Sequence, residues 1–229
     1  MTDTFIFDDF TIDLPLAEVT ARLKLTDEDD VLFIQEKLNT ALEIARPKAI
    51  CRICSVDEIT GAEVFIEGHR FASDVLAKNL EDKHRVFAYV ITCGLEVDAW
   101  SHREEDPVAA FWLDIIKEMI LGKAIQQFYA HLKNTYGFQK TASMSPGSGN
   151  LDVWPIAQQK ELFALLGDVQ ANIGVTLTDS FLMLPTKSVS GVMFPSEVDF
   201  VTCSLCSRAK CPNRRAPQKN DTQPPERDA

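Results

Sequence analysis

The sequence predicts one α+β domain followed by a tail. Its 229 residues are enough for one well-buried core and few for two ordinary domains. Hydrophobic residues make up 45% of the chain and charged residues 25%, which are the proportions of a globular protein. Helix-like and strand-like hydrophobic patterns both occur along the chain, so the predicted class is mixed.

The first elements are a helix and a pair of strands. Apolar residues recur at helical spacing through residues 26–46, Thr26 can cap the start of this helix, and Pro47 follows its end. The β-branched stretches 48–56 and 63–71 predict two short strands or a hairpin.

The middle of the chain predicts a central strand and a long helix. Residues 73–80 read as a short helix capped by Ser73. Residues 86–93 (VFAYVITC) are mostly apolar and precede Gly94, as expected of a strand buried on both faces. A helix starting at Pro107 is apolar on so many sides that most of its surface should be covered. One side of this helix carries Phe111, Ile115, Met119, Phe128 and Leu132, and the apolar face is widened by Val108, Trp112, Ile116 and Ile120.

The last third alternates loops with short elements. Residues 140–152 are small and polar without a hydrophobic period, which predicts a long loop. Pro155 suits the first turn of a helix that ends near Leu166. Two strand-like runs, 180–184 and 188–194, follow. The expected organisation is an N-terminal segment (1–25), a core (26–200), a cysteine-rich segment (201–216) and a disordered tail (217–229).

Charge and composition exclude several classes of partner. The formal net charge of -11 argues against binding to nucleic acid or to an anionic membrane surface. Residues 1–13 carry four aspartates and no lysine or arginine, unlike a secretory or mitochondrial leader. No uncharged run is long enough to cross a bilayer. We therefore expect a cytoplasmic protein that binds neither nucleic acid nor membrane.

Three of the six cysteines have metal-ligand spacing. Cys203, Cys206 and Cys211 form C-x2-C-x4-C, which can place three thiolates around an iron–sulfur cluster or a zinc ion. The fourth ligand must come from elsewhere, and Cys93 is preferred because it ends a strand just before a glycine turn. The other cysteines, a small molecule or a partner could serve instead. Free thiols or a redox pair are the alternative to metal binding.

Other motifs are less specific. Cys51 and Cys54 lie in a strand pattern that sends them to opposite faces, so they are expected to be ordinary buried cysteines. The Gly/Ser-rich loop 143–149 offers backbone N–H groups and hydroxyls, but it is neither a P-loop nor a dinucleotide fingerprint. Lys187 can meet an anion or a partner.

Residues 145–194 resemble the activation domain of cobalamin-dependent methionine synthase, especially its stand-alone versions. The matching features are the Pro-Gly loop, the segments WPIAQQKELF and IGVTLTDSFLMLP, and the strand KSVSG. Weaker likeness extends upstream to about residue 26. The C-terminal cysteines resemble those of some stand-alone members.

The resemblance implies a fold, a cofactor and a partner. The family fold is an α+β domain with a bent, mainly antiparallel sheet and flanking helices. The family binds S-adenosylmethionine and docks over a corrinoid, so that inactive cob(II)alamin is reduced by one electron and remethylated. Here the cobalamin is expected on a separate methyltransferase, because the chain lacks D-x-H-x-x-G. An electron-donor protein is a further expected partner. The implied cofactor-binding residues are Ser145, Pro146, Gly147, Ser148, Val189, Ser190 and Gly191.

The sequence departs from the family pattern at two positions. An arginine three residues before the Pro-Gly pair and a tyrosine just after it are replaced by Ser143 and Ser148. Neither serine can hold the cofactor carboxylate in a charged fork. One alternative is an iron–sulfur or zinc module for electron transfer or interaction that kept the fold and lost the cofactor. Another is a non-catalytic protein that caps a partner.

Overall fold

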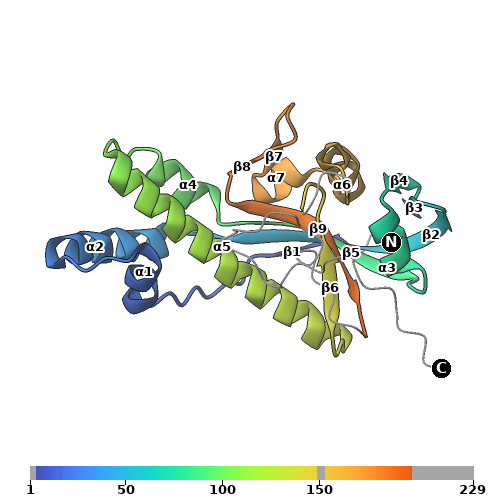
Figure 1. Ribbon diagram of the computed structural model, residues 1–229, viewed down its shortest axis with the longest axis horizontal. Helices are drawn as coiled ribbons and strands as arrows, with labels where there is room; N and C mark the ends of the chain where they lie inside the picture. The colour runs from blue at the N-terminus through green and yellow to red at the C-terminus, as the bar shows by residue number, and fades with distance from the viewer. Residues whose placement is uncertain (1–3, 149–152, 198–229) are drawn as a thin grey trace, which may run out of the picture.

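The computed structural model describes residues 4–148 and 153–197, which form one twisted sheet with helices on both faces (Figure 1). The sheet has seven strands in the order β4-β3-β2-β5-β9-β6, and β1 pairs with β2. Every pairing in it is antiparallel, as predicted. The strands are β1 (Thr4–Phe7), β2 (Lys48–Thr60), β3 (Glu63–Ile66), β4 (His69–Ala72), β5 (Arg85–Thr92), β6 (Thr141–Met144) and β9 (Ser188–Pro195). A separate two-stranded hairpin joins β7 (Thr176–Leu177) to β8 (Met183–Leu184).

Two hydrophobic cores lie on the two faces of the sheet. One core packs under α1 (Leu16–Leu23), α2 (Glu28–Ile44), α4 (Leu95–Ser101) and α5 (Pro107–Tyr136). The other packs under α3 (Asp74–Leu80), α6 (Gln159–Leu166) and α7 (Val169–Ile173), and α6 follows a short 3-10 turn, Ile156–Gln158. Figure 1 shows α5 crossing one side of the sheet and α6 and α7 on the other. Among the described helices none is long and apolar enough to cross a membrane.

Strand β5 is central, as its apolar sequence predicted. It lies between β2 and β9. Val86, Ala88 and Val90 enter the core under α6, whereas the residues between them enter the core under α5. Successive side chains of a strand point to opposite faces, so a strand covered on both sides must be apolar throughout.

Strand β2 bends the sheet. Its first part pairs with β5, and its last part pairs with β3 after a register shift between Val56 and Glu58. An extra residue in one strand bends it and increases its twist, so the two hairpins formed by β2, β3 and β4 turn out of the main plane. The predicted pair of short strands is thus one long strand and two short ones.

The helix boundaries follow local capping. Ser73 caps α3 as predicted, its hydroxyl accepting from the backbone N–H of Leu76 at 3.0 Å. The N-cap of helix α2 is Asp27, one residue after the predicted cap Thr26. The Asp27 carboxylate accepts from the backbone N–H groups of Asp29 and Asp30.

Three sequence expectations are corrected. The stretch 140–152 is not all loop, since residues 141–144 form the edge strand β6. The N-terminal segment contributes β1 and α1, which hydrophobic periodicity did not reveal. On α5, Phe111 is 60% exposed and does not face the core. The buried side of this helix carries Leu113, Ile116, Ile120, Ala124, Phe128 and Leu132.

Candidate functional site

The Pro-Gly turn and the KSVSG strand lie against each other. Strand β6 pairs with β9 so that Met144 stands opposite Val192, which brings the following residue, Ser145, beside Gly191. A Cβ atom on Gly191 would lie 2.4 Å from the Met144 carbonyl oxygen and 2.8 Å from Ser145 Oγ. Such distances are far below van der Waals contact, so only glycine permits this approach.

The predicted residues of β9 point to different faces. Val189 and Gly191 lie on the side of α5, with Ser143 and Ser145. Ser190 lies on the side of α6, where its buried hydroxyl donates to Gln159 Oε1 at 2.6 Å. The side chain of Ser190 is therefore separated by the sheet from Val189, Gly191 and Ser145.

The Pro-Gly turn uses its own backbone donors. Gly147 has φ +77°, and its N–H donates to the Trp154 carbonyl at 2.7 Å. The N–H of Ser148 donates to the Ser145 carbonyl at 3.1 Å. These two N–H groups therefore bond carbonyl groups of the chain itself and are not free to bind a ligand. Gly147 and Ser148 are exposed, and Pro146 is buried.

Trp154 anchors the far side of this turn. Its indole ring is fully buried, packs edge-on against Phe71 and donates from Nε1 to Gln158 Oε1 at 3.0 Å. The amide of Gln158 in turn bonds both backbone groups of Ala72 at the end of β4. The WPIAQQ segment therefore fixes the turn to the far hairpin.

Four hydroxyls form a cluster behind the turn, here called the tyrosine–serine cluster: Tyr89, Tyr129, Ser143 and Ser145. The hydroxyls of Tyr89 on β5 and Tyr129 on α5 are 2.6 Å apart, and Tyr129 donates to Ser143 Oγ at 3.1 Å. Tyr89 also bonds Ser143 and Ser145. Burial is the main cause that raises the pKa of Tyr89 well above its ordinary value, and the neighbouring Tyr129 adds to it. The Tyr89 hydroxyl therefore stays protonated.

The two tyrosines were missed by sequence reasoning. Tyr89 is the one hydroxyl-bearing aromatic in the apolar strand VFAYVITC, and a buried hydroxyl needs a hydrogen-bond partner. That requirement was the available signal. The partner, Tyr129, lies 40 positions away, so no local pattern could identify it.

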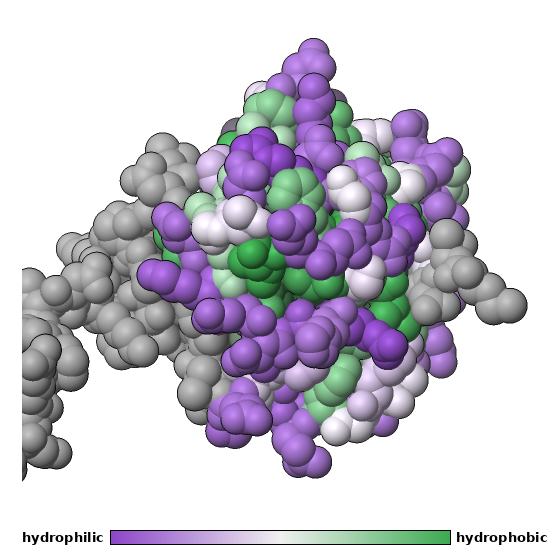
Figure 2. Space-filling model, turned by 90° about the vertical axis from the view of Figure 1, so that its right-hand side faces the viewer, coloured by the Kyte–Doolittle hydropathy of each residue, from purple (hydrophilic) through white to green (hydrophobic). Residues whose placement is uncertain are grey.

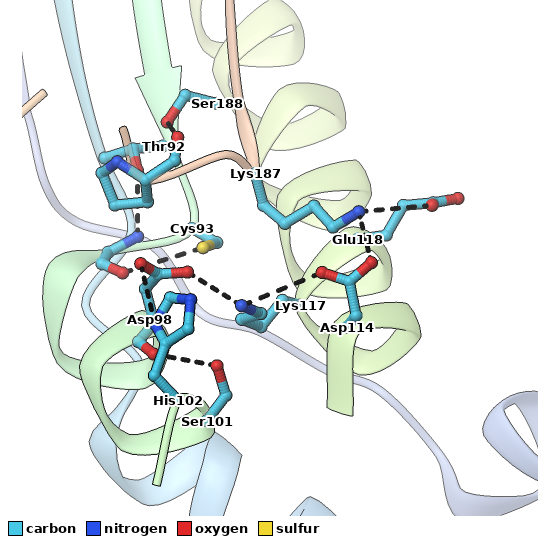
Figure 3. A network of polar contacts seen from close by, with 12 residues as sticks. Thr92, Cys93, Asp98, Ser101, His102, Asp114, Lys117, Glu118, Lys187 and Ser188 are labelled. Carbon is cyan, nitrogen blue, oxygen red and sulfur yellow. Dashed lines mark hydrogen bonds and ion pairs between the residues drawn. The ribbon is translucent and has the colours of Figure 1, made fainter. Parts of the chain in front are cut away.

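A charged network lies near the C-terminal end of β5, beside Thr92 and Cys93 (Figure 3). Lys117 on α5 is buried and pairs with Asp98 on α4, with Nζ 2.8 Å from Oδ1. Lys187, just before β9, pairs with Asp114 at 2.8 Å and approaches Glu118 at 4.0 Å. Lys187, predicted to meet an anion or a partner, is therefore engaged by carboxylates of its own chain.

Cys93 is buried beside this network. Burial is the main cause that raises the pKa of its thiol from 9.0 to about 12, and the negative charge of Asp98 adds to it. The thiol is therefore protonated at neutral pH. Within residues 4–148 and 153–197, no group of three His, Cys, Asp or Glu side chains is arranged to hold a metal ion. Cys203, Cys206 and Cys211 lie outside the described residues.

The topology also bears on Cys93 as a fourth ligand. Ser188 pairs with Thr92, whereas Met193 pairs with Phe87, so β9 leads away from Cys93 toward the Arg85 end of β5. A strand of this length spans about 25 Å at ~3.3 Å per residue. A metal held jointly by Cys93 and the C-terminal cysteines would require the chain to return along the sheet. The assignment stays a prediction.

Cys51 and Cys54 are placed as expected. Cys51 lies in the core under α5 and Cys54 in the core on the opposite face. Burial is the main cause that raises the pKa of both thiols, that of Cys54 to about 12. Both are ordinary buried cysteines.

A separate hollow of about 500 Å³ lies between β2 and α3. Figure 2 views the end of the molecule that carries β2, β3, β4 and α3, and shows apolar side chains framed by hydrophilic ones. Acidic and basic side chains both line the hollow, and the Asp57 carboxylate is already used by Ser55 and by the N–H of Gly68. None of the predicted cofactor-binding residues lines it.

The chain has the fold of a methionine synthase reactivation domain. Its structure is similar to a solved structure described as the MetH reactivation domain bound to AdoHcy, with a TM-score of 0.57 and 15% identity. The similarity covers 87% of this chain and 81% of that one.

A family model identifies the segment more closely. Residues 143–210 match the model described as vitamin B12 dependent methionine synthase, activation domain. The resemblance predicted from residues 145–194 is thus confirmed for this part of the chain. No curated protein matches the sequence.

Proposed function

We propose that this chain is an accessory subunit for the reactivation of a cobalamin-dependent methionine synthase or a related corrinoid methyltransferase. The corrinoid is carried by a separate partner chain, and the methyl donor is S-adenosylmethionine. One observation carries the proposal: the family match covers the turn and strand that are joined at Gly191.

The described residues fit the cofactor in part. Ser145 and Ser148 reach the surface and bear hydroxyls, which can donate to and accept from a ribose or an adenine. No cation stands at positions 143 or 148 to pair with the cofactor carboxylate, and Lys187 is held by Asp114. The residues present therefore suit the nucleoside part of the cofactor better than its amino-acid end.

The role of the protein is to orient the reactants. Bound S-adenosylmethionine supplies a methyl group, and the effectively irreversible methyl transfer draws forward an otherwise uphill one-electron reduction of the corrinoid. The turn, held on β9, presents a rigid surface for the cofactor. Rigid placement of two reactants lowers the barrier because less entropy is lost at the moment of reaction.

A reconstitution experiment tests the proposal. A cobalamin-dependent methionine synthase that lacks its own activation domain is prepared without oxygen in the cob(II)alamin form. It is mixed with this chain, a one-electron donor and S-adenosylmethionine. We expect the cob(II)alamin absorption to disappear, and methionine synthesis to recover, at least tenfold faster than without the chain. S-Adenosylhomocysteine, which has no methyl group to give, is the control. Recovery that is equally slow with and without the chain, together with no complex, contradicts the proposal.

A second function is favoured by the cysteine spacing. C-x2-C-x4-C is suited to an iron–sulfur cluster or zinc, and the family match includes Cys203 and Cys206. The chain would then serve as an electron-transfer or interaction module.

Metal analysis tests this second function. We expect protein purified without oxygen to contain iron with sulfide, or zinc, and Cys206→Ser to lose most of it. Cys54→Ser is the matched control, because Cys54 is buried in the core and should leave the metal content unchanged. A loss of metal from Cys93→Ser would support Cys93 as the fourth ligand. An active, metal-free protein removes this function from consideration.

A further inference from the structure

We propose that Tyr129 and Tyr89 are positioning residues for the Pro-Gly turn. Their hydroxyls hold Ser143 and Ser145 in place on the side of the sheet that α5 covers. The role of the turn as a cofactor-binding surface rests on the proposed function, but its positioning by the tyrosines does not.

The first argument is the reach of the tyrosine–serine cluster. Tyr89 extends from the central strand and Tyr129 from the longest helix of the described chain, and they meet at 2.6 Å. Tyr129 then bonds Ser143, which belongs to the edge strand that enters the turn. One chain of hydroxyl groups thus ties β5, α5 and β6 together at the base of the turn.

The second argument is the close approach at Gly191. The Tyr89 oxygen lies 2.9 Å from the place where a Cβ of Gly191 would stand, in the same gap that admits the Met144 carbonyl and Ser145 Oγ. The missing side chain therefore lets the cluster touch the backbone of β9. The turn is therefore held by the backbone hydrogen bonds between β6 and β9 and by the hydroxyls of the tyrosine–serine cluster.

The third argument is the chemistry of position 143. Where the family pattern has an arginine, this chain has Ser143, which bonds the hydroxyls of Tyr129 and Tyr89. A neutral hydroxyl cluster orders the turn without a cation, and each buried hydroxyl is satisfied by another. The edge strand that these hydroxyls contact, β6, is short, with four residues.

Tyr129→Phe is the sharpest test, because it removes one hydroxyl and keeps the ring. We expect amide hydrogen exchange in residues 141–148 of ligand-free protein to become three- to tenfold faster. This increase corresponds to the net stabilisation that one hydrogen bond contributes. Tyr136→Phe removes the same atom from the same helix, close to its end, and should leave exchange in the turn unchanged. Ser143→Ala breaks the same bond from the turn side and should reproduce Tyr129→Phe, whereas Ser143→Thr, which keeps the hydroxyl, should resemble the native protein.

Cofactor dependence separates positioning from a general loss of stability. In the reconstitution assay we expect Tyr129→Phe to raise the S-adenosylmethionine concentration for half-maximal rate three- to tenfold, with the maximal rate little changed. If the turn exchanges at the native rate in both Tyr129→Phe and Ser143→Ala, the inference is wrong. If the native protein fails to bind S-adenosylmethionine while the exchange result holds, the proposed cofactor is wrong and the positioning role stands.

Discussion

Replacing Gly191 with alanine is expected to displace the Pro-Gly turn and to abolish reactivation. The new Cβ would lie 2.4 Å from the Met144 carbonyl oxygen, and that backbone atom is held in the β6–β9 ladder and cannot rotate away. The strands must therefore separate, at a cost of about 1–3 kcal/mol in the free energy of unfolding. Urea denaturation measures this cost, and the reconstitution assay measures the loss of activity.

Gly122→Ala is the matched control for this change. Gly122 lies inside α5, and a Cβ there meets nothing within 4 Å. Alanine is a better helix former than glycine, so this variant should be as stable as the native protein or more stable, by up to about 1 kcal/mol. If Gly191→Ala retained native reactivation, the joined turn and strand would not form the functional surface.

The second large effect is expected from Asp98→Ala. It removes the 2.8 Å partner of Lys117, whose side chain is 5% exposed, and leaves Asp114 at 3.9 Å. A buried ammonium group that loses its main partner destabilises the fold by about 3–5 kcal/mol, less here because Asp114 remains. Chemical denaturation should show this as a lower midpoint with an unchanged slope.

Two further variants identify the cause of this effect. Glu104→Ala breaks the Lys37–Glu104 pair, which is also short, at 2.6 Å, but more exposed, so its effect on stability should be much smaller. Adding Lys117→Met to Asp98→Ala removes the unpaired charge and should restore most of the lost stability. An equal loss in the single and double variants would assign the effect to the start of α4 and not to the buried charge.

The network of Asp98, Lys117, Asp114 and Lys187 also has a structural consequence. It joins α4 and α5 to the residue that precedes β9 (Figure 3). The strand that carries Gly191 is thus fixed at its start by ion pairs and farther along by the tyrosine–serine cluster. The Pro-Gly turn is supported by both.

Elements with a local cause could be predicted from the sequence alone. The unbroken apolar run of β5 required cover on both faces, and Ser73 could accept from a backbone donor in the first turn of α3 without help from the rest of the fold. The ordered motifs of segment 145–194 also indicated a resemblance to the methionine synthase activation domain, which the family match over residues 143–210 confirms for that part of the chain.

Features that depend on distant partners could not be predicted, because they arise from contacts in the folded chain. Residues 141–144 have no strand pattern and become β6 because β9 offers an unpaired edge. Ser190 and Gly191 were predicted to act together, but strand alternation places them on opposite faces. Tyr89 meets Tyr129 across 40 positions, and Lys117 is stable inside an apolar core because Asp98 reaches it from another helix. Hydrogen bonds and ion pairs of this kind depend on distances in space, which no periodicity along the chain records.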